Sequence, residues 1–295
     1  MANSITRFKN YIPMLDEVYK AASLTSVLDG AAELARQGVN ANELVIPKMS
    51  MDGLADYSRN GGYVTGDVTL TNETVKCNFD RGRMFTVDTL DNEETAGIAF
   101  GRLAAEFIRT KVVPELDAFR MATYAGMTGI SAATAAALSA GANVVSALRD
   151  AVNKMDEDEV PSEERYLFIT PTLISLVEDL DTTKSRAVLE RFARVIRIPQ
   201  TRFYTKITQY DGTTSGQTTG GYIKNADTNA PGKNINFMVI QKGAVIQFQK
   251  HVAPKVITPE QNQDADAWKF GYRNVGIAEV YENKVSGIYL HASTT

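Results

Sequence analysis

The stretch YSRNGGYVTGDVTLTNETVKCNFDRGRMFTVD, Tyr57–Asp88, decides the fold class because polar and apolar residues alternate along most of its length. Val75, Cys77 and Phe79 alternate with polar neighbours, and this period of two predicts strands with one apolar and one polar face. Glycines cluster between residues 53 and 66, where the chain would turn back. We therefore predict a long, half-polar β-hairpin rather than the densely apolar strands of an enzyme core.

The predicted hairpin is long for a protein of this size. If residues 45–88 fold back once, each arm has about 20 residues and spans ~65 Å at ~3.3 Å per residue. A compact globule of 295 residues has a radius of gyration of ~19 Å and a diameter of ~50 Å. A two-stranded ribbon alone in water is marginally stable. The hairpin must therefore curl or protrude, and a protruding hairpin needs a partner surface, for which another copy of the chain is the first candidate.

Composition narrows the functional classes. Hydrophobic residues make up 44% and charged residues 22% of the chain, as in ordinary globular proteins with one large or two smaller domains. The net charge of −4 gives no basic excess for binding nucleic acid by counterion release, so a DNA-reading protein is not expected. One cysteine allows no intrachain disulfide, and we recognise neither a membrane span nor a secretion signal. The sequence predicts a protein that is made and kept in a reducing cytoplasm, or that leaves the cell by a route without such a signal.

The first half of the chain also contains two helical patterns. An amphipathic pattern predicts a helix over residues 15–37, followed by a strand over residues 43–49. A second helix is predicted from Asp91, which would cap it, to about residue 110. Pro114 either kinks this helix or begins another one that runs to about Met127.

The second half mixes helices and strands without βαβ repetition, which indicates the α+β class. Residues 128–142 are small and form either a flexible connector or tightly packed backbone, and residues 214–233 have the composition of a surface loop. The C-terminal residues read as a hairpin that turns at Glu282–Lys284. The remaining predicted elements are a helix over 143–155, a polar loop over 156–164, a strand over 165–170, a helix from Pro171, and strands over 235–241 and 244–250 joined by a turn at Lys242-Gly243.

Candidate catalytic and ligand-binding residues are few and scattered. His251 and His291 have no ligand-spaced neighbours, so we interpret both as structural or surface residues. Cys77 alternates with polar residues and has no nearby histidine, which favours a small hydrophobic residue over a nucleophile. The acidic run 156–159 lacks EF-hand spacing and reads as a solvated loop. We therefore expect no catalytic residue, no cofactor and no metal site.

The order of these parts resembles the major capsid proteins of tailed bacteriophages, whose fold is named after phage Hong Kong 97. The similar stretches are VVPELDAFRMATYA (112–125), RYLFITPTLISLV (165–177), NFMVIQKGAVIQFQK (236–250) and YRNVGIAEVYENKVSGIYLHA (272–292). The resemblance implies an α+β, Hong Kong 97-like major capsid fold. Its parts would be an N-terminal arm with a helix (1–44), an extension loop (45–90), a spine helix with the peripheral domain (91–127), an apical domain (128–254) and a return to the peripheral domain (255–295).

The same resemblance implies a function. Such a protein assembles as hexamers and pentamers into an icosahedral shell in the host cytoplasm, and the shell encloses double-stranded DNA without sequence-specific binding. Scaffolding, portal and decoration proteins are the implied partners, and no membrane is involved. Two alternatives stay open: an encapsulin-like nanocompartment shell around a cargo enzyme, and a cytosolic enzyme of unknown reaction. Size-exclusion chromatography distinguishes the enzyme from a shell protein, and the contents of the particle distinguish a phage shell from a nanocompartment shell.

The shell interpretation places candidate interface residues at three positions. Tyr57, Arg59 and Tyr63 would lie near the tip of the extension loop and contact a neighbouring subunit. Arg81 and Arg83 would lie near its base, where they either form ion pairs between subunits or are simply solvated. The spine helix would contribute Glu94, Arg102 and Glu106.

Two family variations bear on processing and locking of the shell. Some members carry an N-terminal scaffolding segment that a protease removes, whereas here the first predicted helix begins near Leu15, so we expect no such trimming. Other members join their subunits through a lysine–asparagine isopeptide bond, with the lysine on the extension loop. Residues 50–75 contain no lysine, and Lys48 and Lys76 lie toward the base. We therefore expect a shell held by non-covalent contacts.

Overall fold

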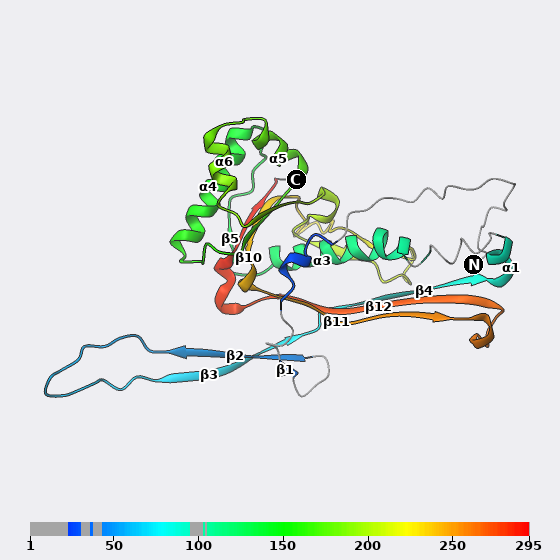
Figure 1. Ribbon diagram of the computed structural model, residues 1–295, viewed down its shortest axis with the longest axis horizontal. Coiled ribbons are helices and arrows are strands. Elements are labelled where there is room, and N and C mark those ends of the chain that lie inside the picture. The colour runs from blue at the N-terminus through cyan, green and yellow to red at the C-terminus, as the bar shows by residue number, and fades with distance from the viewer. Residues whose placement is uncertain (1–22, 31–35, 38–42, 95–102, 104, 295) are drawn as a thin grey trace.

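A computed structural model describes residues 23–30, 36–37, 43–94, 103 and 105–294. Figure 1 shows a body with a helix-covered sheet at one end and a long, three-stranded sheet along one side, and a hairpin that extends away from both. Helix α3 lies between the two sheets. The mixture of helices and strands confirms the predicted α+β class.

The protruding hairpin is built from β2 (Glu43–Met51) and β3 (Val68–Lys76), which pair antiparallel over their whole length. The short strand β1 (Arg36–Gln37) pairs with β2 near the base. Residues 52–67 form the tip beyond the paired strands. Each arm has 9 residues and spans ~30 Å, so the prediction of two arms of about 20 residues is wrong.

The predicted second arm is shorter because β4 (Phe79–Asp88) belongs to the body. It pairs antiparallel with β12 (Ala267–Val280), which pairs on its other side with β11 (Val245–Ile257). Asn78 marks the change of partner: its Nδ2 donates to the Ala278 carbonyl at 2.6 Å, and its Oδ1 accepts the Ala278 N–H at 3.1 Å. Alternation of polar and apolar residues predicts a strand in both sheets alike, so it could not reveal this change.

The helical part that follows β4 begins earlier than predicted. Helix α1 (Thr89–Glu94) starts after Asp88, whose Oδ1 accepts the Leu90 N–H at 2.9 Å. Asp88 therefore caps the helix, and the prediction that Asp91 does so is wrong.

A second helical segment runs along the body. A π-helical segment, η3 (Ile108–Val112), leads directly into α3 (Val113–Ala125). Pro114 lies in the first turn of α3, where a missing N–H costs no hydrogen bond, so it begins a helix rather than breaking one.

The other end of the body is a five-stranded sheet in the order β5-β13-β10-β6-β7. Neighbouring residues of the central strand face opposite sides: Phe237 and Val239 join one apolar cluster with the helices α4 and α5, while Met238 and Ile240 join another with α3. The strands are β5 (Ser131–Ala132), β6 (Arg165–Ile169), β7 (Arg194–Arg197), β10 (Ile235–Gln241) and β13 (Ile288–Ala292), and the helices on its outer face are α4 (Gly141–Glu157), α5 (Pro171–Glu178) and α6 (Thr183–Leu189).

Most predicted elements of this end are confirmed, whereas the C-terminal hairpin is wrong. Strands β12 and β13 lie in different sheets, joined by the 3₁₀ segment η7 (Glu282–Gly287). Strands β10 and β11 likewise separate at η5 (Lys242–Ala244), the predicted turn. The segments η5 and η7, which carry the chain from one sheet to the other, pack together. A Cβ on Gly287 would lie 2.5 Å from the Ala244 Cβ, so this contact requires glycine.

Three further features of the body were not predicted. Strands β6 and β7 are parallel and are connected through α5 and α6. Strands β8 (Ile207–Gln209) and β9 (Tyr222–Lys224) form a small hairpin whose second strand lies within the predicted 214–233 loop. Short 3₁₀ segments occur at Gln200–Arg202 (η4) and Pro259–Gln261 (η6). Of the two alternatives for the small residues 128–142, the structure favours attached backbone: the Ala133 N–H donates to the Leu290 carbonyl at 2.9 Å and the Ala136 N–H to the Ala292 carbonyl at 3.1 Å, although residues 128–140 are exposed or half-buried.

The predicted helix over residues 15–37 falls largely outside the described residues. Where the structure describes it, residues 23–30 contain only the 3₁₀ turn η1 (Ser26–Leu28), and residues 36–37 are a strand. The prediction is wrong in this part. Buried polar contacts of the backbone with α3, described below, replace the helical hydrogen bonds there.

Candidate functional site

The hairpin presents a large apolar surface to solvent. Leu54 is 107% and Tyr63 is 89% exposed relative to a free residue, and no body element covers either of them within the described chain. Monomeric proteins rarely leave so many large apolar side chains together in water, so this surface has the character of a binding interface. The apolar side chains of the hairpin that are more than half exposed are Met49, Met51, Leu54, Tyr57, Tyr63, Val64, Val68 and Leu70.

The hairpin tip has internal order although no other element of the described residues covers it. The Tyr57 and Tyr63 rings pack with their centroids 4.9 Å apart, across the backbone bridge between Ser58 and Gly62. Asp52 Oδ2 accepts the backbone N–H of Asp67 at 2.8 Å, which closes the neck of the tip. The predicted residues Tyr57, Arg59 and Tyr63 therefore do lie at the tip, and their contact with a neighbour remains a proposal.

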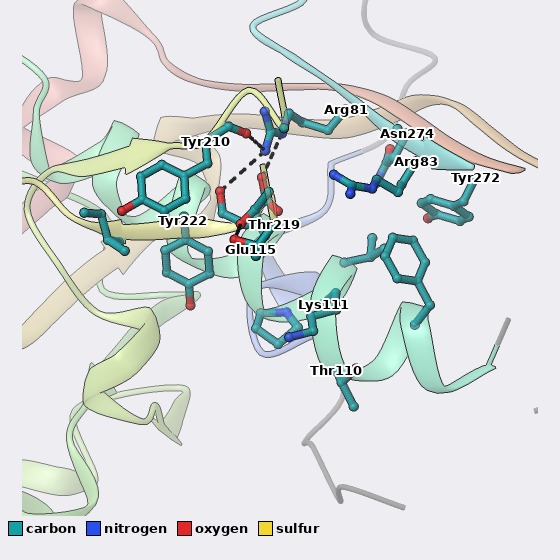
Figure 2. A pocket seen from close by; sticks show the side chains of 18 of the residues that line it. Arg81, Arg83, Thr110, Lys111, Glu115, Tyr210, Thr219, Tyr222, Tyr272 and Asn274 are labelled. Atoms are coloured by element: carbon teal, nitrogen blue, oxygen red, sulfur yellow. Dashed lines mark hydrogen bonds and ion pairs between the residues drawn. The ribbon is translucent and has the colours of Figure 1, made fainter. Parts of the chain in front are cut away.

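A second candidate site is a cavity of about 1340 Å³ in the body, open to solvent. Strands β4 and β12 form one wall, the η3–α3 helix forms another, and the β8–β9 hairpin with its connecting loop forms the third (Figure 2). Three aromatic rings line one end: Phe107 packs edge-on against Phe85 at 4.8 Å and against Tyr272 at 6.2 Å between centroids. Burial raises the pKa of Tyr222 to about 12, so this phenol remains a hydrogen-bond donor at neutral pH.

Arginines from β4 cross this cavity. Arg81 Nε donates to Glu115 Oε1 at 2.8 Å, and its Nη2 donates to the Tyr210 carbonyl at 2.7 Å (Figure 2). Arg83 Nη2 donates to the Thr218 carbonyl at 3.2 Å. These bonds hold the 210–221 loop against β4. Arg81 therefore forms an ion pair within its own chain, from the part of β4 that follows the hairpin, and its contact with a neighbouring subunit stays a proposal, as does that of Arg83.

Asn274 is the unusual member of the cavity wall. It lies opposite Arg81 in the β4–β12 pairing and is 1% exposed, yet neither its Nδ2 nor its Oδ1 has a hydrogen-bond partner. A buried amide without partners costs roughly 1–3 kcal/mol. Such a group in a cavity wall is expected to receive its partners from a molecule that binds there. The sequence offered no signal for Asn274, since its burial depends on pairing with β4, about 190 residues away.

A buried polar cluster fixes the segment 23–30 on α3. Asp117, fully buried, accepts hydrogen bonds from the Ser23 hydroxyl at 2.8 Å and from the Thr25 hydroxyl at 2.8 Å. Arg120 donates to Thr25 Oγ1 at 2.9 Å. Nearby, Gln247 Nε2 donates to the Thr25 carbonyl at 2.7 Å. The start of the described chain is thus held by charged and amide groups as well as by apolar packing of Leu28, which is fully buried in the core.

The remaining predicted residues have varied positions. Glu106 lines the cavity and pairs with Arg109 one turn later on the same helix. Glu94 is the last residue of α1, and Arg102 lies outside the described residues. Cys77 packs against a small apolar cluster, as a small hydrophobic residue would. The structure does not bring these residues together with the hairpin tip.

The residues weighed as ligands or catalysts have structural partners. Buried His291 lies 3.1 Å from the Asn236 amide, while His251 is exposed on β11. In the acidic run, Asp156 pairs with Arg165 at 2.7 Å and Asp158 pairs with Lys154. The described residues contain no group of three or more His, Cys, Asp or Glu side chains arranged to hold a metal ion. None of the described helices is both long and apolar enough to span a membrane.

Comparison with known proteins identifies the fold. No protein-family model matches the chain, and no curated protein matches it. Solved structures do match over nearly its whole length. One from Mycobacterium phage Che8 has a TM-score of 0.63 at 13% identity and covers 99% of this chain and 98% of its own. The capsid structure of cyanophage P-SCSP1u has a TM-score of 0.60 at 12% identity and covers 99% and 93%.

A further match broadens this group. A virus-like particle from Pyrococcus furiosus has a TM-score of 0.53 at 11% identity and covers 91% of this chain and 97% of its own. Other matched structures come from phages, among them the mature capsid of bacteriophage PhiM1, with a TM-score of 0.60 at 13% identity, which covers 100% of this chain and 91% of its own. The chain therefore has the capsid fold of tailed bacteriophages, as the order of its parts predicts.

Proposed function

We propose that this protein is a major capsid protein, which assembles into the icosahedral shell around the double-stranded DNA of a tailed bacteriophage. The observation that carries the proposal is the protruding hairpin, whose large apolar side chains are exposed in the isolated chain. The capsid fold over nearly the whole chain supports the same conclusion. The net charge of the chain is −4, which is compatible with a shell that encloses DNA without binding its phosphates tightly.

The shape of the subunit favours a head-to-tail contact. The hairpin leaves the body at one end, and its apolar tip and the cavity are different surfaces of the same subunit (Figure 1). A contact between two different surfaces repeats from one copy to the next, and it closes into a ring when the rotation permits. Hexamers and pentamers arranged in a shell are such rings. We propose Tyr57, Arg59 and Tyr63 as residues that contact the next subunit.

Other predicted positions keep a proposed role. Glu94, Arg102 and Glu106 belong to the proposed spine region 91–127 and would face neighbouring subunits. We propose that the rest of the chain divides into an N-terminal arm (1–44), an extension loop (45–90), an apical domain (128–254) and a return to the peripheral domain (255–295). Strand β4, which lies within residues 45–90, pairs in the body sheet. Scaffolding, portal and decoration proteins are the proposed partners, and the virion, assembled in the host cytoplasm, is the proposed location.

The experiment that tests this function measures both the size of the assembly and the contents of the particle. The purified chain should elute from size exclusion as rings or megadalton particles, whereas an enzyme would elute as a small oligomer. Particles isolated with an antibody from cells that carry the gene should protect double-stranded DNA from DNase. A small oligomer would contradict the shell, and particles that contain a cargo protein without DNA would identify a nanocompartment instead.

A further inference from the structure

We propose that the cavity between β4, α3 and the β8–β9 hairpin binds a nucleotide, whose base pairs with the Asn274 amide and whose phosphate pairs with Arg83. The nucleotide is either free or part of a single DNA strand. This site goes beyond the shell function and does not depend on it. Three features of the cavity wall carry the proposal: a buried amide without partners, cations without acidic partners, and a cluster of aromatic rings.

The first feature, the Asn274 side chain, requires a ligand that both donates and accepts hydrogen bonds. The residue is 1% exposed, and neither its Oδ1 nor its Nδ2 has a partner in the described part of the chain. Inorganic phosphate in its fully ionised form offers only acceptors, and an acyl chain offers neither donors nor acceptors. The edge of a nucleobase presents a donor and an acceptor side by side, and an asparagine amide pairs with adenine through both.

The second feature is an excess of cations that the cavity itself does not neutralise. Its acidic side chains are already engaged, since Glu115 pairs with Arg81, Glu106 with Arg109, and Asp80 with Arg273. Asp211 accepts hydrogen bonds from its own loop. Among the described residues, the cavity cations that have no acidic partner are Arg83, Lys111 and Lys224. The cavity therefore favours an anionic ligand.

Arg83 connects the first two features. Figure 2 shows it beside Asn274, whose amide is closed to water. Within the described chain, Arg83 makes one hydrogen bond, from its Nη2 to the neutral Thr218 carbonyl at 3.2 Å. A phosphate forms stronger, charge-assisted hydrogen bonds with a guanidinium group. Arg83 would therefore turn from the carbonyl toward the phosphate, and this movement would uncover the Asn274 amide for the base.

The third feature is the aromatic end of the cavity. Phe85, Phe107 and Tyr272 form a cluster of edge-on rings there. Such rings pack well against a planar aromatic base, whereas a sugar phosphate has no flat apolar ring to place against them. The cavity has a volume of about 1340 Å³, which leaves room for base, sugar and phosphate together. A nucleotide satisfies all three features.

Isothermal titration calorimetry of the full chain with AMP tests the site. AMP should bind, whereas adenosine, which lacks the phosphate, and inorganic phosphate, which lacks the base, should each bind about tenfold more weakly or less. A single-stranded oligodeoxyadenylate distinguishes the two sources of the ligand. Tighter binding of the oligonucleotide than of AMP would assign the site to a DNA strand, and binding of AMP alone would assign it to free nucleotides.

Two variants assign the contacts. Purine riboside 5′-monophosphate is AMP without the exocyclic amino group, so the unaltered chain should bind it about tenfold more weakly than AMP, while Asn274→Leu should bind both alike. Arg83→Gln should weaken AMP binding by about tenfold and leave adenosine binding unchanged. The control Arg149→Gln removes an exposed charge on α4, outside the cavity, and should leave AMP binding unchanged.

Circular dichroism establishes that each variant is folded before its affinity is compared. The absence of AMP binding to the unaltered chain would overturn the site, and so would inorganic phosphate that binds as tightly as AMP. Unchanged AMP affinity in either Asn274→Leu or Arg83→Gln would overturn it as well. Because the titration does not depend on particles, each of these results would leave the shell function standing.

Discussion

Arg202 Nη1 donates a hydrogen bond to Asp117 Oδ2 at 2.9 Å, and both side chains are almost completely removed from solvent. Asp117 lies on α3 and Arg202 on η4, and the same carboxylate accepts hydrogen bonds from the segment around Ser23 and Thr25. One buried charge therefore joins three parts of the chain that are far apart in sequence.

Removing this charge should destabilise the subunit strongly. Asp117→Asn leaves the buried Arg202 guanidinium without its carboxylate partner, and breaking a buried pair typically costs about 3–5 kcal/mol. Urea unfolding of the unassembled chain measures the loss. As a control, Glu178→Gln breaks the exposed pair with Arg197 and should cost at most about 1 kcal/mol. A small and similar loss of the free energy of unfolding in both variants would show that the polar cluster around Asp117 does not hold the segment 23–30.

The unpaired amide of Asn274 predicts a gain in stability when it is replaced by an apolar side chain. Asn274→Leu replaces a buried group that lacks partners, so the free energy of unfolding of the unassembled chain should rise by about 1 kcal/mol. Asn236→Leu is the matched control: its amide donates to the Ala136 carbonyl at 2.8 Å, so this variant should lose stability. A similar loss of stability in both variants would show that the Asn274 amide contributes hydrogen bonds to the folded chain.

The buried His291 predicts a loss of stability in acid. Burial lowers the pKa of His291 below its usual value of about 6.5, and the neighbouring Asn236 Nδ2 can only donate to the His291 Nδ1. Above pH ~6.5 the His291 ring is neutral in both the folded and the unfolded chain. Below this pH the ring binds a proton more readily in the unfolded chain than in the folded chain, so the free energy of unfolding falls. His291→Gln should therefore lose less stability than the unaltered chain between about pH 7.5 and about pH 5.5 in denaturant unfolding.

The unaltered chain provides the reference for this pH effect. If the free energy of unfolding falls by the same amount between about pH 7.5 and about pH 5.5 in the unaltered chain and in His291→Gln, the loss in acid belongs to carboxylates instead.

Shell subunits should separate completely in detergent. An isopeptide bond needs a lysine amine close to an amide, and the hairpin has no lysine between residues 50 and 75. Boiled particles should therefore run as a single band near 32.3 kDa on a denaturing gel. A ladder of multimers that survives reducing agent would show covalent locking through another lysine.

Much of the architecture could be predicted because it depends on local patterns. The period of apolar residues located α4, and Pro171 located the start of α5, since both signals lie within one element. Partner choice was harder. β12 was expected to pair with the C-terminal strand that follows it, whereas it pairs with β4 and β11, because Gly287 lets the chain pass close to Ala244 into the other sheet.

The two candidate sites also differ in whether local sequence patterns could reveal them. The tip residues Tyr57, Arg59 and Tyr63 could be found because glycines and alternation mark a hairpin locally. The cavity could not be found, because its walls come from segments more than 100 residues apart. The hydrogen bond from Arg81 to the Tyr210 carbonyl and the burial of Asn274 both depend on that tertiary arrangement.

Electron microscopy of two purified chains tests the central claim most directly: the unaltered protein and a variant that lacks residues 52–66. The unaltered chain should form closed icosahedral particles. The deletion removes the exposed tip, which no other element of the described chain covers, so this variant should remain folded by circular dichroism and form no closed particle. Normal particles from the deletion variant, or only small oligomers from the unaltered chain, would contradict the account.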